Sequence, residues 1–256
     1  MIGKWLHAGV LEEGRVSYPE AGSPQGGVVS PMLSNIYLHY VLDEWIERQV
    51  RPCMKAQIFL IRYADDFVIG FADEQDARRV MEVLPKRYGK YGLTLHPDKT
   101  RLVPFRKPSA APTRKGPGSS DGPGSFDLLG FTHYWGVSRK GAWVVKRKTA
   151  GSRMARALWK IAQWCRIHRH RPVREQHQAL CQKVRGHLAY YGMTGNASAL
   201  SSFRHWVAHI WRKWLSRRKR GRPYPWVQFR RLLERYPLPY VTLPHSVYRR
   251  VANSVI

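Results

Sequence analysis

The feature that most constrains this chain is the near absence of acidic residues from its second half. Residues 139–256 contain 27 Lys and Arg but only two acidic residues, Glu175 and Glu234, whereas residues 1–138 contain 17 basic and 15 acidic residues. A folded domain with so many uncompensated cations repels itself unless an anion binds to it. The second half is therefore expected to bind a polyanion, either a nucleic acid or an anionic membrane surface.

Nucleic acid is the favoured polyanion because the same half is rich in aromatic residues. It holds seven of the ten tryptophans of the chain. Some of these must be core, but aromatic rings among arginines also suit stacking on unpaired bases. The cations are spread over several segments rather than over one amphipathic face, which argues against a helix lying on a membrane surface.

Three further features indicate the compartment. No run of about 18 apolar residues occurs that could span a membrane, and the residues after Met1 lack the apolar stretch of a signal peptide. The three cysteines are too few and too scattered for a disulfide framework, which favours a reducing environment. A cytoplasmic protein without a membrane association is therefore expected.

Hydrophobic periodicity predicts an α+β chain with a small antiparallel sheet before a basic helical bundle. Strands are predicted over residues 57–63, 67–71, 93–95 and 100–105 and a hairpin over 135–145; helices are predicted over 31–50 and over 74–91, the second capped by Asp73 and interrupted by Pro85. Three apolar stripes mark the later helices: Leu158, Ile161 and Cys165; His177, Leu180, Val184 and Leu188; and Leu200, Phe203, Val207, Ile210 and Trp214.

A stretch of low complexity lies near the middle of the chain. Residues 106–125 contain four Pro, four Gly and four Ser, so the segment cannot bury a core and is expected to be a flexible surface loop. Two domains are predicted: residues 1–135, which include this loop, and residues 136–256.

The strongest candidate for chemistry is the tip of the hairpin between the first two strands. Asp65 and Asp66 are adjacent there, and only a tight turn lets both carboxylates approach one site. Carboxylate oxygens suit Mg²⁺, and two such ions about 4 Å apart can activate a hydroxyl and stabilise a leaving oxygen in phosphoryl transfer. An ordinary acidic turn is the alternative, since Asp is a common turn residue.

The residues around this pair give a resemblance to a known family. The ordered motifs resemble the palm of a reverse transcriptase, and within that group the reverse transcriptase/maturases encoded by group II introns. They are Gly22–Pro31 (GSPQGGVVSP), Tyr63–Asp66 (YADD), Gly92–Thr100 (GLTLHPDKT) and Leu129–Phe131 (LGF), followed by Gly186–Gly192 (GHLAYYG), Gly195-Asn196 and Trp211–Arg218 (WRKWLSRR), which are similar to the maturase part.

The resemblance implies roles for individual residues. Asp65 and Asp66 match the metal-binding pair, with Asp65 as the main Mg²⁺ ligand. Lys99 matches a cation that would stabilise or protonate the departing pyrophosphate, although a solvated surface lysine is an equal alternative. The remaining candidates are the binding residues Pro24, Gln25 and Gly26, in the loop beside the nascent base pair, with Tyr63, and the primer-gripping hairpin at Leu129–Phe131, which could equally be core.

The activity that the resemblance implies is RNA-directed DNA synthesis from dNTPs with Mg²⁺, in a partial palm over residues 1–135. The basic residues 136–256 would form a thumb and maturase domain that binds group II intron RNA and stabilises its splicing-competent fold. A DNA primer or target DNA is the other expected partner; no obligate protein partner is evident. A bacterial, nucleoid-associated location follows from the family.

Several departures from the family pattern leave a second function open. The fingers and a third catalytic aspartate are expected upstream of the Gln25-Gly26 loop, so the chain resembles an N-terminally truncated copy; Glu12, Glu13 and Glu20 are the acids available there. A non-catalytic RNA-binding splicing factor, or an inactive fragment, is therefore the alternative. No paired Cys-x-x-Cys of a zinc-supported endonuclease occurs, and a buried cysteine with RNA-facing histidines is favoured over a zinc site at Cys165, His168 and His170.

Overall fold

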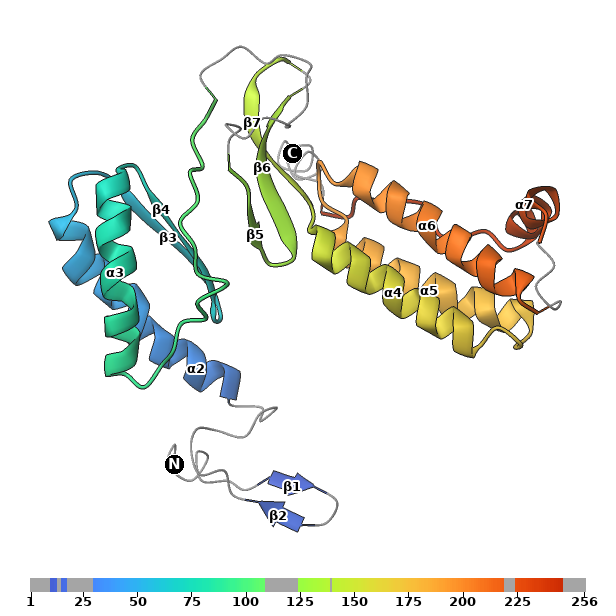
Figure 1. Ribbon diagram of the computed structural model, residues 1–256, viewed down its shortest axis with the longest axis horizontal. Helices are drawn as coiled ribbons and strands as arrows, with labels where there is room; N and C mark the ends of the chain where they lie inside the picture. The colour runs from blue at the N-terminus through green and yellow to red at the C-terminus, as the bar shows by residue number, and fades with distance from the viewer. Residues whose placement is uncertain are drawn as a thin grey trace, which may run out of the picture. The chain divides into compact units, whose positions relative to one another are not determined.

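The computed structural model describes Val10–Glu12, Arg15–Ser17 and residues 30–108, 124–138, 140–218 and 224–245. The chain divides into two compact units, residues 1–103 and residues 104–256 (Figure 1). The first segments form a short antiparallel pair, β1 (Val10–Glu12) with β2 (Arg15–Ser17). Both remaining parts combine helices with small antiparallel sheets, which confirms the predicted α+β class.

The first unit is built from a long helical run, a hairpin and a second helix. The run begins with α2 (Ser30–Leu38), passes through the π-helical segments η1 (His39–Asp43) and η2 (Ile46–Val50), and ends in the 3₁₀ turn η3 (Arg51–Cys53). The hairpin consists of β3 (Ile58–Tyr63) and β4 (Asp66–Phe71), and α3 (Glu74–Lys90) follows. Asp73 caps α3 by accepting a hydrogen bond from the Asp76 amide at 3.0 Å, as the sequence predicts.

Polar contacts from α3 fix the other two elements of this unit. The buried Asp76 carboxylate accepts hydrogen bonds from the backbone amides of Lys55 and Ala56 at 2.7 and 3.3 Å, which fixes the approach to β3. The guanidinium of Arg87 donates to the carbonyls of Tyr40 and Val41, at 3.2 and 3.0 Å. These carbonyls lie in η1, where π-helical bonding departs from the α-helical pattern, so Arg87 ties the widened turn to α3.

One face of the hairpin is covered by the two helical elements. The core of the first unit joins the helical run, the start of β3 and the inner face of α3 through Val41, Leu42, Trp45, Ile46, Val50, Ile58, Val80, Leu84 and Tyr88. The opposite face of β3 presents Phe59, Ile61 and Tyr63, which are 60, 61 and 67 % exposed. Strands β3 and β4 pair only with each other in the described residues, so both outer edges of this sheet are unpaired there.

The second unit starts with a three-stranded meander and continues as a helical bundle. The meander is β5 (Phe126–Leu128), β6 (Phe131–Val137) and β7 (Trp143–Thr149), with the predicted turn at Ser138–Gly141. The helices are α4 (Gly151–Ile167), α5 (Val173–Tyr191), α6 (Ala197–Ser216) and α7 (Trp226–Arg235). None of the helices in the described ranges combines the length and apolar character needed to cross a membrane.

The bundle core confirms most positions of the first two predicted stripes and corrects the third. Ile161, Cys165, Leu180, Val184 and Leu188 are buried as expected, whereas Leu158 and His177 are only partly buried. On α6 the fully buried residues after Val207 are Trp211 and Leu215, whereas Ile210 and Trp214 are only partly buried. Trp211 turns inward because its indole N–H donates to buried Gln176 at 3.0 Å, and its ring packs against Phe229 of α7.

Two other predictions fail between the units. The strands predicted at residues 93–95 and 100–105 do not form: residues 93–108 contain turns and irregular backbone. The amides of Lys99 and Thr100 donate to the His96 carbonyl at 3.2 and 3.0 Å, and the Pro104 carbonyl accepts one isolated bond from the Gly124 amide at 3.0 Å, so no ladder with a partner strand forms in the described residues. Most of the predicted loop at 106–125 lies outside the described residues.

The stability of the second unit should depend on pH through His187. This side chain stacks on Phe203 with ring centroids 3.7 Å apart, and burial lowers its pKa to about 4. A histidine in the unfolded chain protonates near pH 6.5, so the stabilisation is complete above that pH and is lost as the pH falls toward 4. We expect a loss on the order of 1 kcal/mol in the free energy of unfolding, given the partial exposure of the ring.

Thermal unfolding followed by tryptophan fluorescence between pH 7.5 and pH 4.5 measures this effect. A His187→Phe variant should lose less stability than the wild type over that range, because it retains the stacking but cannot be protonated. The matched variant His170→Phe, at an exposed position, should follow the wild-type profile. Identical pH profiles for wild type and His187→Phe would contradict the assignment.

Candidate active site

The turn between β3 and β4 places the two predicted carboxylates at one tip. Tyr63 pairs with Asp66 in the antiparallel register, so Ala64 and Asp65 form a two-residue connection. Ala64 has φ 53°, a left-handed conformation that costs a non-glycine residue energy and that the surrounding contacts must maintain. Tyr63, Asp65 and Asp66 are all exposed. The structure therefore brings these three site residues together as the sequence predicts.

The carboxylates at this tip are free to bind a ligand. Within the described residues, no hydrogen bond or ion pair engages the side chains of Asp65 or Asp66. Two adjacent, unpaired carboxylates repel each other, and a cation relieves that repulsion. Hard oxygen ligands of this number fit Mg²⁺, which binds through one or two carboxylates and takes its other ligands from phosphate and water.

A third metal-ligating side chain is not found at this tip in the part of the chain that the structure describes. No group of three or more His, Cys, Asp or Glu side chains gathers there around a common point. The acids that the sequence offered as third ligands lie at Glu12, whose side chain is not described, and at Glu13 and Glu20, which fall outside the described residues.

The guanidinium of Arg62 stabilises the turn through hydrogen bonds. Its Nε and Nη2 donate to the two carboxylate oxygens of Asp43 at 2.8 and 2.7 Å, a bidentate pair. Its Nη1 donates to the Asn35 side chain at 2.9 Å and to the Ala64 carbonyl at 3.0 Å. One guanidinium thus connects α2 and η1 to the backbone of the turn, at the residue with the left-handed φ.

The contacts between Arg62 and Asp43 favour the charged forms of both side chains. Hydrogen bonding to Arg62 lowers the pKa of Asp43 against the opposing effect of burial, and His39 contributes a weaker contact at 3.3 Å. The pKa of Arg62 is raised in turn by its hydrogen bond to Asp43. Burial raises the pKa of nearby Tyr88 to about 12, so that phenol stays neutral. Arg62 and Asp43 therefore form a charged pair at the base of the turn.

The sequence analysis did not predict the ion pair between Arg62 and Asp43. Arg62 is the one charged residue within the apolar strand Ile58–Tyr63, and Asp43 interrupts an apolar helical face. A charged residue at such positions signals a buried or half-buried partner. The two residues are 19 apart in sequence, so periodicity alone does not pair them.

The other predicted site residues are not gathered at the tip by any contact that the structure records. Lys99 is exposed in the turn that follows α3, and no contact joins it to Asp65 or Asp66 among the described residues. The loop residues Pro24, Gln25 and Gly26 lie outside the described residues. The roles of these four residues therefore stay predictions.

The Leu129–Phe131 motif belongs to the second unit and contacts the Gly186–Gly192 motif. Leu129 and Gly130 form the β5–β6 turn with φ of 51° and 79°. The phenol of Tyr190 donates to the Leu129 carbonyl at 3.1 Å, and the Phe131 and Tyr191 rings meet edge to face at 5.1 Å. A Cβ on Gly130 would lie 2.9 Å from the Tyr191 hydroxyl, so glycine is needed for this close approach.

Buried polar groups complete the junction between sheet and bundle. Asn196 is fully buried; its Oδ1 accepts from the Thr149 amide at 2.8 Å, and its Nδ2 donates to the Tyr191 carbonyl at 2.9 Å. Cys165 is fully buried in the bundle, where burial raises the pKa of its thiol to about 12. The sequence reading of Cys165 as a core residue is confirmed.

Comparison with known proteins gives one family match and short local similarities. The family model described as reverse transcriptase (RNA-dependent DNA polymerase) matches residues 1–133. An uncharacterized 91 kDa protein in the cob intron of Schizosaccharomyces pombe is 57 % identical over 47 residues, 18 % of this chain and 6 % of that protein. Group II intron-encoded protein LtrA of Lactococcus lactis subsp. cremoris is 48 % identical over 46 residues, 18 % of this chain and 8 % of LtrA. The matched segments thus cover less than a tenth of either relative.

Removing the Arg62 guanidinium should loosen the turn. We expect Arg62→Met to lower the free energy of unfolding of the first unit by about 1–2 kcal/mol, because the half-buried Asp43 loses its partner. Amide hydrogen exchange at Ala64–Asp66 should become faster than in the wild type.

The control is Arg78→Met, which breaks the exposed pair with Glu74, where both side chains are more than half exposed. That variant should change stability by less than about 0.5 kcal/mol and leave exchange at the turn unaltered. Equal effects of the two substitutions on exchange at the turn would show that Arg62 does not brace it.

Proposed function

The chain belongs to the reverse transcriptase (RNA-dependent DNA polymerase) family, and on that premise we propose that its first unit carries out RNA-templated DNA synthesis at the turn of Asp65 and Asp66. The observation that carries the proposal is this pair of exposed, unpaired carboxylates on a braced two-residue turn. Such a pair is unfavourable without a cation, and a site for a nucleoside triphosphate provides a use for one.

The chain's own residues have distinct tasks in this proposal. Asp65 and Asp66 would hold Mg²⁺, which when bound neutralises phosphate charge and activates a hydroxyl for in-line phosphoryl transfer. Arg62 keeps the carboxylates in place by fixing the Ala64 carbonyl. Lys99 is the candidate cation for the departing pyrophosphate of a dNTP, and Tyr63, Pro24, Gln25 and Gly26 are the candidates for contact with the nascent base pair.

The second unit is proposed to bind group II intron RNA and to act as a maturase. Its basic composition and its eight tryptophans support this partner, as does the local similarity of the chain to a protein named as group II intron-encoded. Its helices carry the motifs Gly186–Gly192 and Trp211–Arg218, which resemble the maturase part of the family. A DNA primer or target is the second proposed nucleic acid.

A second function is favoured by one specific observation. Only two carboxylates gather at the candidate site in the described part of the chain, whereas two-metal chemistry commonly needs further ligands. In this alternative the chain is an RNA-binding splicing factor, and the first unit is a scaffold.

Primer extension on an RNA template distinguishes the two functions. The wild type should extend a DNA primer in the presence of Mg²⁺ and dNTPs, and Asp65→Asn should reduce extension at least about 100-fold while leaving RNA retention intact. The control Glu82→Gln removes an exposed carboxylate from α3 and should extend as the wild type does. Extension by Asp65→Asn at the wild-type rate would refute the catalytic assignment. Absent extension by a wild-type chain that still retains intron RNA would establish the splicing-factor alternative.

A further inference from the structure

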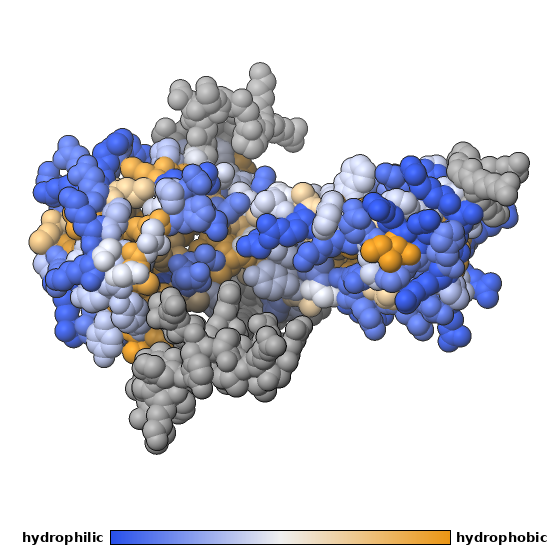
Figure 2. All heavy atoms as spheres, turned by 60° about the horizontal axis from the view of Figure 1, so that its bottom comes forward, coloured by the Kyte–Doolittle hydropathy of each residue, from blue (hydrophilic) through white to orange (hydrophobic). Residues whose placement is uncertain are grey.

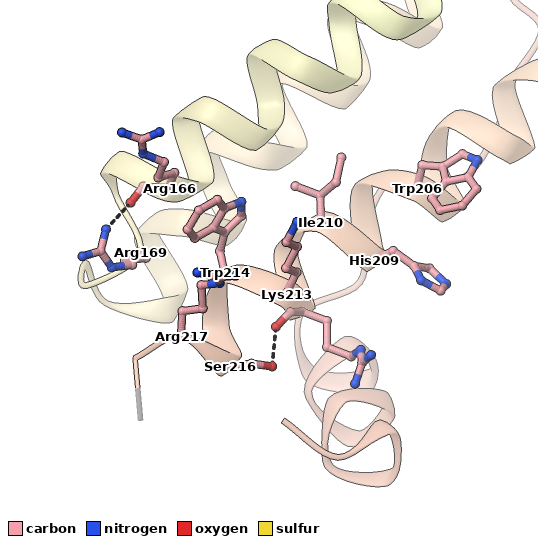
Figure 3. A pocket seen from close by; sticks show the side chains of 10 residues that line it. Arg166, Arg169, Trp206, His209, Ile210, Lys213, Trp214, Ser216 and Arg217 are labelled. Carbon is pink, nitrogen blue, oxygen red and sulfur yellow. Dashed lines mark hydrogen bonds between the residues drawn. The ribbon is translucent and has the colours of Figure 1, made fainter. Parts of the chain in front are cut away.

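A hollow of about 1180 Å³ lies where α4 and α6 end in the second unit (Figure 3). Arg166 comes from the last turn of α4 and Arg169 from the connection that follows it, while the other lining residues come from α6 and the turn after it. Trp214 and Lys213 lie between these arginines and Trp206 in the close view. This hollow is far in sequence from Asp65 and Asp66 and belongs entirely to the second unit.

Five cations line this hollow: Arg166, Arg169, Arg212, Lys213 and Arg217. In the described part of the chain, no acidic side chain forms an ion pair with any of them. The surface of the second unit in Figure 2 is accordingly dominated by hydrophilic side chains.

Local contacts account for only part of this charge. The Arg212 guanidinium lies 3.9 Å from the Trp226 ring centroid and donates to the Tyr224 carbonyl at 2.8 Å, so Arg212 has a structural role. Cations near helix C-termini also complement the helix dipole, and Arg169 donates to the Arg166 carbonyl at 2.9 Å. Neither effect requires five cations around one hollow, and their mutual repulsion is relieved by a bound anion.

The aromatic residues of the hollow indicate which anion. Trp206 is 53 % exposed, and Trp214 is partly buried with Arg217 above its ring at 5.4 Å. The two tryptophans are eight positions apart, which corresponds to roughly 12 Å along α6. This is the length of about three to four stacked nucleotides at ~3.4 Å each. Exposed indole faces suit unpaired bases, whereas a duplex presents its phosphates and not its base faces.

We infer that this hollow binds single-stranded RNA, with an unpaired base stacked on Trp206 and the backbone phosphates on Arg166, Arg169 and Lys213. The inference rests on the proposed RNA-binding function of the second unit. It further specifies the surface that binds the RNA and that the bound RNA is single-stranded. RNA is favoured over an anionic membrane because the cations surround a concavity whose apolar groups are two indole rings and the single aliphatic side chain of Ile210, too few for a lipid-inserting face.

Fluorescence anisotropy with the full chain tests the inference, using an unstructured 12-nucleotide oligouridine and an RNA hairpin duplex over a range of salt concentrations. Trp206→Ala should weaken binding of the single strand about tenfold and leave duplex binding within twofold. The double variant Arg166→Gln/Arg169→Gln should weaken both and reduce the slope of log affinity against log salt for the single strand by about one.

Matched controls exist on the outer face of α4. Trp159 is 62 % exposed and does not line the hollow, so Trp159→Ala should bind the single strand as the wild type does. Arg156→Gln/Lys160→Gln removes the same charge from exposed positions outside the hollow and should weaken single-strand binding less than the arginine pair of the hollow does.

Each of the following outcomes would overturn the inference. Equal losses for Trp206→Ala and Trp159→Ala, or for the two double variants, would show only general electrostatic attraction. A loss for Trp206→Ala that is as large for the duplex as for the single strand would exclude base stacking. Binding to phosphatidylserine vesicles that requires Trp206 and competes with RNA would assign the hollow to a membrane. If the wild type binds neither RNA, the proposed function of the second unit fails as well; wild-type binding that all variants retain rejects this inference alone.

Discussion

The candidate active site depends on the ion pair between Arg62 and Asp43. A two-stranded hairpin is marginally stable by itself, and β3–β4 is covered on one face only, by the helical run and α3. From that covered face, Arg62 reaches the carbonyl of Ala64 and so stabilises a turn with an unfavourable φ. Its pairing with Asp43 is bidentate and half-buried, with side chains 13 and 25 % exposed, so it is screened less than a surface pair. The carboxylates of Asp65 and Asp66 can remain unpaired because the Arg62 guanidinium stabilises the turn through the backbone carbonyl of Ala64 and does not bind their side chains.

In the second unit, neutral groups stabilise the corresponding tight turn. Its β5–β6 turn is fixed by the phenol of Tyr190 and by close packing of Gly130 on Tyr191, and buried Asn196 joins Tyr191 to β7. Carboxylates are almost absent from this half of the chain, so amide and phenol groups supply the contacts that an ion pair supplies in the first unit. Residues of the motifs that resemble a maturase thus stabilise the junction between the sheet and the bundle. The cations on the surface are not needed for these contacts and can bind a ligand.

Sequence was sufficient where the determining interactions are local. The Asp73 cap, the hairpin at Asp65 and Asp66 and the buried faces of α3, α4 and α5 follow from spacing and turn chemistry. It was insufficient where two registers are equally helical: on α6, residues 210 and 214 continue the stripe as well as 211 and 215, and contacts with Gln176 and Phe229 decide between them. The strands expected at 93–95 and 100–105 failed because apolar residues there have no partner strand. The ion pair between Arg62 and Asp43 could not be predicted because the two residues come into contact only in the folded chain.

The uneven distribution of charge distinguishes the two units of the chain. The first unit contains ion pairs such as Arg62–Asp43 and Arg79–Asp76, yet within the described residues it leaves Asp65 and Asp66 unpaired at an exposed tip. The second unit leaves several cations unpaired around a concave surface. Each arrangement is unfavourable alone: the first requires a cation, and the second requires an anion. A phosphate backbone accompanied by divalent cations would satisfy both requirements, since Asp65 and Asp66 would hold the cations and the arginines would bind phosphates. A small anionic metabolite would satisfy at most one of them, which supports nucleic acid as the ligand proposed for both units.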